Sequence, residues 1–217
     1  MNIEQARFNM IEQQIRPWDV LDADILHLLS VVKREDFVPL AYKALAFTDM
    51  EIPLGHGQAM LAPRVEARLV QDAGVRKHEK VLEIGAGSGY MTALLAHRAQ
   101  RVLALEINPE LAAMARTNLA NAGIHNAEVR LCDGAQGAAA DGPFDVIVLD
   151  GSVAEVPQTL LAQLKVGGRL IAIVGNEPMM RTTIITRTSE SNFTTQQPWD
   201  TIVPRLLNFP EPSKFQF

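Results

Sequence analysis

The stretch Val81-Leu82-Glu83-Ile84-Gly85-Ala86-Gly87-Ser88-Gly89-Tyr90 decides the fold of this chain. It runs from an apolar strand into three glycines at alternate positions, and the apolar spacing of Met91, Leu94 and Leu95 then indicates a helix. Glycine tolerates positive φ and, because it lacks a Cβ, lets backbone amides approach a ligand closely. The stretch therefore predicts a strand, a loop and a helix that bind a nucleoside-bearing cofactor.

The spacing of the glycines separates two classes of cofactor. Dinucleotide-binding loops follow the pattern G-x-G-x-x-G, and Tyr90 stands where the last glycine of that pattern would be. The order here is Glu83-x-Gly85-x-Gly87-x-Gly89, which resembles motif I of the class I S-adenosylmethionine-dependent methyltransferases. Such a cofactor has no pyrophosphate but carries an ammonium group, whose charge we expect Glu83 to balance.

Two further carboxylates follow predicted strands. Residues 101–106 form a strand that ends at Glu106, which we expect to bind the ribose of the cofactor, and residues 127–131 run into Asp133 and Gly134. Ligands of open α/β sheets bind outside the carboxyl ends of the strands, so Asp133 is placed to accept from the adenine amino group. Alone, Glu106 could be a solvated residue before a helix and Asp133 could cap a turn with Gly134. The combination of the three motifs favours the cofactor site.

The chain from residue 79 to 174 alternates strands and helices, which predicts a parallel sheet covered on both faces. We expect a three-layer α/β/α, Rossmann-like fold of the class I methyltransferase type, mostly parallel, with an antiparallel pair at residues 182–187 and 201–203 and with N-terminal helices. The remaining predicted strands are 143–150 and 167–175, and the predicted helices are 88–98, 109–121 and 155–164.

The first third of the chain has a different pattern. Apolar spacing predicts a helix over 2–16 that Pro17 ends, a second helix capped by Asp22, and a helix from about residue 63 to 72. Between them, residues 37–58 are interpreted as an irregular segment of the kind that is often functional. We expect one folding unit, in which residues 1–75 are a helical extension with a substrate-side loop and residues 76–217 bind the cofactor.

Composition excludes several other classes of protein. Twenty basic against 25 acidic residues give a net charge of −5, which argues against nucleic-acid binding. The single cysteine, Cys132, excludes an internal disulfide and a cysteine-based zinc site, and no metal site is predicted. No apolar run of roughly 18 residues and no signal-peptide core are present, so we expect a cytoplasmic protein without a membrane partner. The oligomeric state is left open.

Beyond motif I, the chain resembles the protein-L-isoaspartate O-methyltransferase family over roughly residues 7 to 190. The resemblance implies S-adenosylmethionine as cofactor, a class I fold with an added N-terminal helical part, and methylation of an isoaspartyl α-carboxylate in damaged proteins. The matching motifs are Arg7-x-x-Met10-Ile11, Phe37-Val38-Pro39, Leu54-Gly55-x-Gly57-Gln58, Cys132-Asp133-Gly134-x-x-Gly137, Pro143-Phe144-Asp145 and Gly167-Gly168-Arg169-Leu170.

Two motifs depart from that family on the substrate side. In the run Gln58-Ala59-Met60-Leu61, Ala59 stands at the family's threonine, and Leu61 stands at the serine usually assigned to the active site. After the fourth strand, Asp150 stands in Leu149-Asp150-Gly151-Ser152, where the family has a Thr-Ala-Ala run. The added carboxylate repels an anionic acceptor by about 1 kcal/mol or more. Both changes predict weak activity on isoaspartyl peptides.

The acceptor determines which further groups the chemistry needs. A carboxylate acceptor is ionised at neutral pH and needs no general base. A phenol or amine acceptor would need one, and Asp150 or His56 could take the proton. The plainer alternatives are that His56 bonds to backbone in its loop and that Asp150 caps a helix. Three functions therefore stay open: an isoaspartyl methyltransferase, a methyltransferase of the same lineage with another, possibly small-molecule, acceptor, and a cofactor-binding module without turnover.

Overall fold

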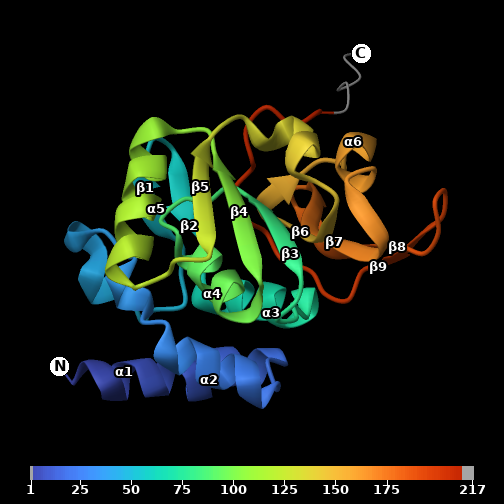
Figure 1. The fold of residues 1–217 in the computed structure, drawn as a ribbon. Helices are drawn as coiled ribbons and strands as arrows, with labels where there is room; N and C mark the ends of the chain where they lie inside the picture. Colours follow the sequence, from blue (N-terminus) through green and yellow to red (C-terminus); the bar gives the residue numbers. More distant parts are fainter. Residues whose placement is uncertain (1, 212–217) are drawn as a thin grey trace, which may run out of the picture.

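A seven-stranded sheet occupies the centre of the computed structural model, which describes residues 2–211 (Figure 1). The strand order is β5-β4-β3-β6-β7-β8-β9, parallel from β5 to β7 and antiparallel from β7 to β9. The strands are β3 (Lys80–Ile84), β4 (Arg101–Glu106), β5 (Ala127–Leu131), β6 (Phe144–Val153), β7 (Leu164–Asn176), β8 (Met179–Arg187) and β9 (Phe193–Gln196). The expected class of fold is confirmed.

The central strands carry apolar side chains on both faces of the sheet, so helices cover both faces. Val81 and Val148 pack with helices α3 (Pro63–Ala73), α4 (Tyr90–Arg98) and α5 (Pro109–Asn121). Leu82 and Leu149 pack on the opposite face against α6 (Gln158–Leu161) and the segment that contains Leu206. The arrangement brings the carboxyl ends of β3, β4 and β6 to the same edge of the sheet.

The N-terminal helices α1 (Ile3–Met10) and α2 (Ala23–Val31) form the bottom edge of the molecule in Figure 1. Helix α2 contacts α3 and α4 on the side away from the sheet, and α1 continues into a π-helical turn that contacts α3. Asp22 caps α2, since its side chain accepts from the amides of Asp24 and Ile25. A π-helical turn, Ile11–Ile15, and short 3-10 helices at Arg16–Trp18, Arg34–Asp36, Leu40–Leu45, Gly134–Gln136 and Ala139–Asp141 complete the helical elements of residues 2–211. No helix in this part of the chain is long and apolar enough to cross a membrane.

Three expectations about local structure need correction. The main antiparallel partner of β8 is β9, because the chain turns back within five residues and Thr188 N donates to Asn192 O at 2.9 Å. The segment expected to pair with β8 makes only an isolated antiparallel bridge to its beginning, between Arg181 and Asp200, and Thr201 N donates to Met180 O at 3.1 Å. The helix expected at 155–164 is only the single turn α6, since Pro157 precedes it and β7 begins at Leu164. The segment expected to be irregular contains an antiparallel hairpin of β1 (Ile52–Gly55) and β2 (Gln58–Met60).

Candidate cofactor-binding site

The register of the parallel strands places Gly85, Glu106 and Asp150 side by side at the carboxyl ends of β3, β4 and β6. Ile84 pairs with Leu105 of β4 on one side and with Leu149 of β6 on the other. The next residue along each strand is therefore Gly85, Glu106 or Asp150. Asp133 lies just beyond the end of β5, whose Leu131 pairs with Glu106. The predicted convergence of these residues at the carboxyl edge of the sheet is confirmed.

The loop after β3 requires its glycines. Gly85, Gly87 and Gly89 have φ of +97°, +51° and +86°, in the region that L side chains rarely adopt. A Cβ on Gly85 would stand 2.9 Å from Leu206 Cδ2, and one on Gly89 would stand 3.2 Å from Ala115 Cα. The loop is thereby kept close to both the sheet and α5, and its backbone borders the space in front of the strands.

Two adjoining hollows at this edge form one trough. Both are lined by Gln58, Gly85, Glu106 and Leu206, so they are continuous at these residues. The residues that line only the first hollow include Ala59, Met60, Glu66, Gly87 and Asp150. Those that line only the second include Ile107, Asp133, Gly134, Leu207 and Phe209.

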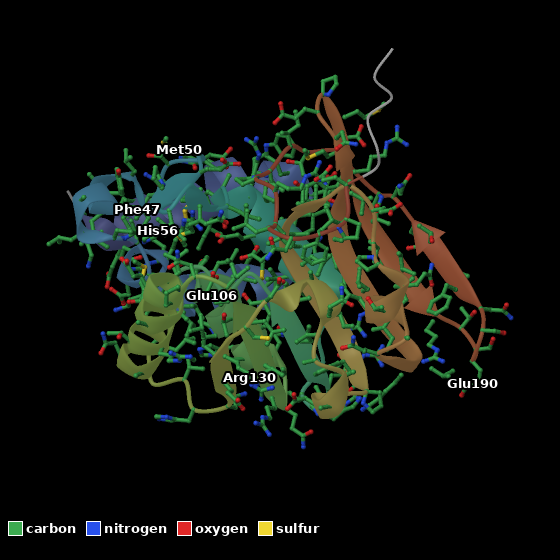
Figure 2. All side chains as sticks on the ribbon, turned by 90° about the horizontal axis from the view of Figure 1, so that it is seen from above. Phe47, Met50, His56, Glu106, Arg130 and Glu190 are labelled. Atoms are coloured by element: carbon green, nitrogen blue, oxygen red, sulfur yellow. The ribbon has the colours of Figure 1, made fainter. Side chains whose placement is uncertain are left out.

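Glu106 lies at the junction of the two hollows and is only 5 % exposed. Its Oε2 accepts from Gly87 N at 2.8 Å and its Oε1 accepts from Asn108 N at 2.9 Å, which fixes the carboxylate and holds the glycine loop. Each oxygen keeps a second lone pair. Figure 2 shows Glu106 beside the sheet and His56 farther toward the N-terminal part. A fixed, charged acceptor in this position suits a ligand that presents two hydroxyl groups.

Beyond the shared Glu106, the second hollow has one further carboxylate, Asp133, and an otherwise largely apolar lining. Asp133 Oδ1 accepts from Ala135 N at 3.0 Å, and its Oδ2 accepts from Asn208 Nδ2 at 2.7 Å. Gly134 admits no side chain, because a Cβ there would stand 2.3 Å from Ile84 Cγ2. The apolar side chains of Leu207 and Phe209 complete this hollow. It suits a flat, apolar ring system that carries a hydrogen-bond donor at its edge.

Two carboxylates with buried, unpartnered oxygens lie at the first hollow, the fully buried Glu83 and the half-buried Asp150. Glu83 is 0 % exposed, and neither of its oxygens has a hydrogen-bond partner among residues 2–211. Burial is the main cause that raises the pKa of Glu83 to about 8; the nearby Thr92 hydroxyl lowers it, and the neighbouring carboxylates of Glu106 and Glu66 add to the rise. Asp150 lines the hollow, its Oδ1 is buried without a partner in the described chain, and burial raises its pKa well above the ordinary value. A cationic ligand would satisfy these groups.

The buried pair of Arg34 and Glu66 was not among the predicted site residues. Arg34 is 0 % exposed and pairs with Glu66, which is 1 % exposed, and it also donates to Leu61 O at 2.7 Å. Its guanidinium lies 5.3 Å from the centre of the Tyr90 ring. One signal was available in the sequence. Glu66 stands three residues before Leu69 and four before Val70, so it lies on the apolar face of its helix.

The predicted substrate-side residues divide between the trough and the core. Gln58, Ala59 and Met60 line the first hollow, whereas Leu61 packs in the core with 2 % exposed. His56 stands at the hairpin turn with φ of 55° and lies 3.1 Å from Glu110 Oε2 through its Nε2, so the expected backbone bond is wrong. The helix-cap alternative for Asp150 is also wrong, since the residue lies within β6.

The residues of the trough fit S-adenosylmethionine. The backbone of the glycine loop borders the trough at Gly85 and Gly87, Glu106 presents free lone pairs between the hollows, and unpartnered carboxylates lie at one end. A nucleoside with a cationic tail matches all three features. The structure thus supports the ligand class that motif I predicts, and the individual contacts stay predictions.

Comparison with known proteins identifies related sequences and folds. The model of the protein-L-isoaspartate (D-aspartate) O-methyltransferase family matches residues 5–203. A protein-L-isoaspartate O-methyltransferase of Methanoculleus marisnigri is 41 % identical over 171 residues, covering 79 % of this chain and 78 % of that protein. One of Gloeobacter violaceus is 41 % identical over 180 residues, covering 82 % and 88 %. A Plasmodium falciparum structure assigned to the same enzyme, in complex with S-adenosyl-L-homocysteine, has a TM-score of 0.77 at 20 % identity and covers 91 % of this chain and 96 % of that one.

Proposed function

The chain belongs to the protein-L-isoaspartate (D-aspartate) O-methyltransferase family, and on that basis we propose that it methylates a carboxylate of damaged proteins, the isoaspartyl α-carboxylate. It is an S-adenosylmethionine-dependent methyltransferase, as its family is. The observation that carries the site assignment is the convergence of Gly85, Glu106 and Asp133 on one trough. Its net charge argues against a nucleic-acid substrate, and we propose a cytoplasmic enzyme.

The proposed contacts follow the length of the trough. Asp133 accepts from the adenine amino group, and Gly134 borders the ring with its backbone while its missing side chain lets Ile84 pack close. Glu106 accepts from the ribose hydroxyls, and Glu83 balances the ammonium charge from behind the loop. When bound, S-adenosylmethionine supplies a methyl group on a positively charged sulfur, ready for in-line displacement. The task of the chain is to align donor and acceptor and to exclude water.

The acceptor side is assigned to the first third of the chain. Gln58, Ala59 and Met60 border the sulfonium end of the trough, so we propose that residues 1–75 position the acceptor and residues 76–217 hold the cofactor. A carboxylate acceptor is already ionised at neutral pH, and no side chain of the trough needs to remove a proton. Ala59 offers no hydroxyl to a peptide or carboxylate. We therefore propose slow turnover on isoaspartyl peptides.

The test is transfer of a labelled methyl group to an isoaspartyl peptide, with the aspartyl peptide of the same sequence as control. Wild-type protein should give low but isoaspartyl-dependent turnover. The Ala59→Thr, Leu61→Ser double variant should turn over faster, because it restores two hydroxyls. Because Leu61 is buried, the double variant can unfold. The single variant Ala59→Thr keeps the test valid in that case. Equal transfer to both peptides by every folded variant would contradict the proposed acceptor.

A second candidate function is methylation of a different, possibly small-molecule, acceptor. The lining of the first hollow favours it, because Ala59 and Met60 are apolar and Asp150 adds a carboxylate that an anionic acceptor must approach. A third alternative, cofactor binding without turnover, shares the same trough. Turnover with a small-molecule set but none with either peptide would support the second candidate, and binding of the cofactor with no transfer at all would support the third.

A further inference from the structure

The two hollows define the direction in which the proposed cofactor lies, and the inference below rests on that cofactor. Asp133 and the apolar side chain of Phe209 mark the adenine end, and Glu106 at the junction marks the ribose. The sulfur follows the ribose along the molecule. It therefore falls in the first hollow, which Asp150 and Glu66 line.

This end of the trough gathers more carboxyl groups than cationic groups. Glu66 and Asp150 line it, and Glu83 lies behind it. Arg34 is a positively charged side chain that interacts electrostatically with Asp150. Its guanidinium, however, already pairs with Glu66 and donates a hydrogen bond to Leu61 O. A buried carboxylate without a partner is costly, because it has lost its hydration and gained no bond in return.

Asp150 is placed to be satisfied from the trough. It follows Leu149 on a central strand, its backbone oxygen is 3.3 Å from the Cβ position of Gly85, and its Oδ1 is buried with no partner among the described residues. Glu83 is likewise unpartnered, but it lies outside the lining of the hollow. Of the two unpaired carboxylates, Asp150 is thus the one that borders the space the sulfur would fill.

We propose that Asp150 is a charge-selective residue, whose carboxylate faces the sulfonium centre and makes the protein bind S-adenosylmethionine more tightly than S-adenosylhomocysteine. Donor and product share the adenosine and the ammonium group, and they differ in the methyl group and in the charge on sulfur. A carboxylate near the sulfur attracts the positively charged sulfur of the donor. The neutral sulfur of the product gives that carboxylate no such interaction. Product release after transfer is favoured by the same contact.

The test compares three ligands by calorimetry on the full chain. S-adenosylmethionine has the charged sulfur, sinefungin carries an ammonium group at the same position, and S-adenosylhomocysteine has a neutral sulfur. Asp150→Asn should weaken the two charged ligands by about tenfold or more and change the neutral one by less than about threefold. Asp145→Asn is the matched control, because it makes the same change at the other end of β6, where Asp145 pairs with Lys165.

Equal weakening of all three ligands by Asp150→Asn would contradict the proposal, since it would indicate contact with the shared part of the ligand or a structural role. Unchanged affinity for all three would contradict it as well. If the Asn variant does not fold, Asp150→Ala gives the same comparison. Failure of the wild-type chain to bind any of the three would instead overturn the proposed cofactor, so the two failures are distinguishable.

Discussion

Replacing Arg34 by Met should cost the protein a large part of its stability. Arg34 is fully buried, and the change removes its ion pair with Glu66, its hydrogen bond to Leu61 O and its contact with the Tyr90 ring. Removing one partner of a buried pair leaves the other charge without compensation, which costs about 3–5 kcal/mol. We expect a loss of that size in the free energy of unfolding at about pH 7.5.

The expected loss depends on pH in a defined direction. Burial already raises the pKa of Glu66 to about 7 despite Arg34, and removing the guanidinium raises it further. A group whose folded pKa lies above its unfolded value destabilises the fold as pH rises from the unfolded pKa toward the folded one. The deficit of Arg34→Met should therefore be smaller at about pH 5.5 than at about pH 7.5.

Urea denaturation followed by circular dichroism measures both effects, with Arg101→Met, at an exposed pair with Glu128, as a control. The Arg34→Met, Glu66→Leu double variant should recover at least half of the loss, because it removes the stranded carboxylate. A single variant within about 1 kcal/mol of wild type, or a double variant no more stable than the single, would refute the reasoning.

Three further predictions concern the trough. Glu106→Gln should raise the Kd for S-adenosylmethionine about tenfold, because a neutral amide binds ribose hydroxyls less strongly, and calorimetry with no change would count against the ribose assignment. With a folded pKa of about 8, Glu83 should make the ligand-free protein less stable as pH rises from about 5 to 8, and Glu83→Gln should flatten that slope in urea titrations. Gly134→Ala should cost about 1–3 kcal/mol in the same assay, because its Cβ would stand 2.3 Å from Ile84 Cγ2, and a neutral effect would contradict that contact.

Periodic and local signals predicted most of the central fold. The apolar run that begins at Val81 and the glycine pattern at Gly85–Gly89 correctly indicated β3, its loop and α4, and the helix expected at 109–121 agrees with α5. The positions of Glu106 and Asp133 also followed, because strands of a parallel sheet deliver their final residues to one edge.

The errors arise where the pairing of strands or of charged side chains is decided by tertiary contacts and not by the local sequence pattern. Residues 193–196 and 201–203 are both β-branched or aromatic runs. The short turn at Thr188 places the first run in the ladder with β8, and the second segment is left with an isolated bridge at Arg181 and Asp200. The β1–β2 hairpin is short and includes Pro53, so its sequence shows little strand signal. The ion pair of Arg34 and Glu66 joins residues far apart in the chain, and neither charge identifies its partner from sequence alone.

The central claim is that the trough holds an adenosyl sulfonium with its adenine at Asp133, its ribose at Glu106 and its sulfur beside Asp150. A crystal structure of the chain with bound S-adenosylhomocysteine tests it most directly. We predict ribose hydroxyls within hydrogen-bond distance of the Glu106 carboxylate and the sulfur in the hollow that Asp150 lines. A ligand bound in the reverse direction, or bound with its ribose away from Glu106, would contradict the account.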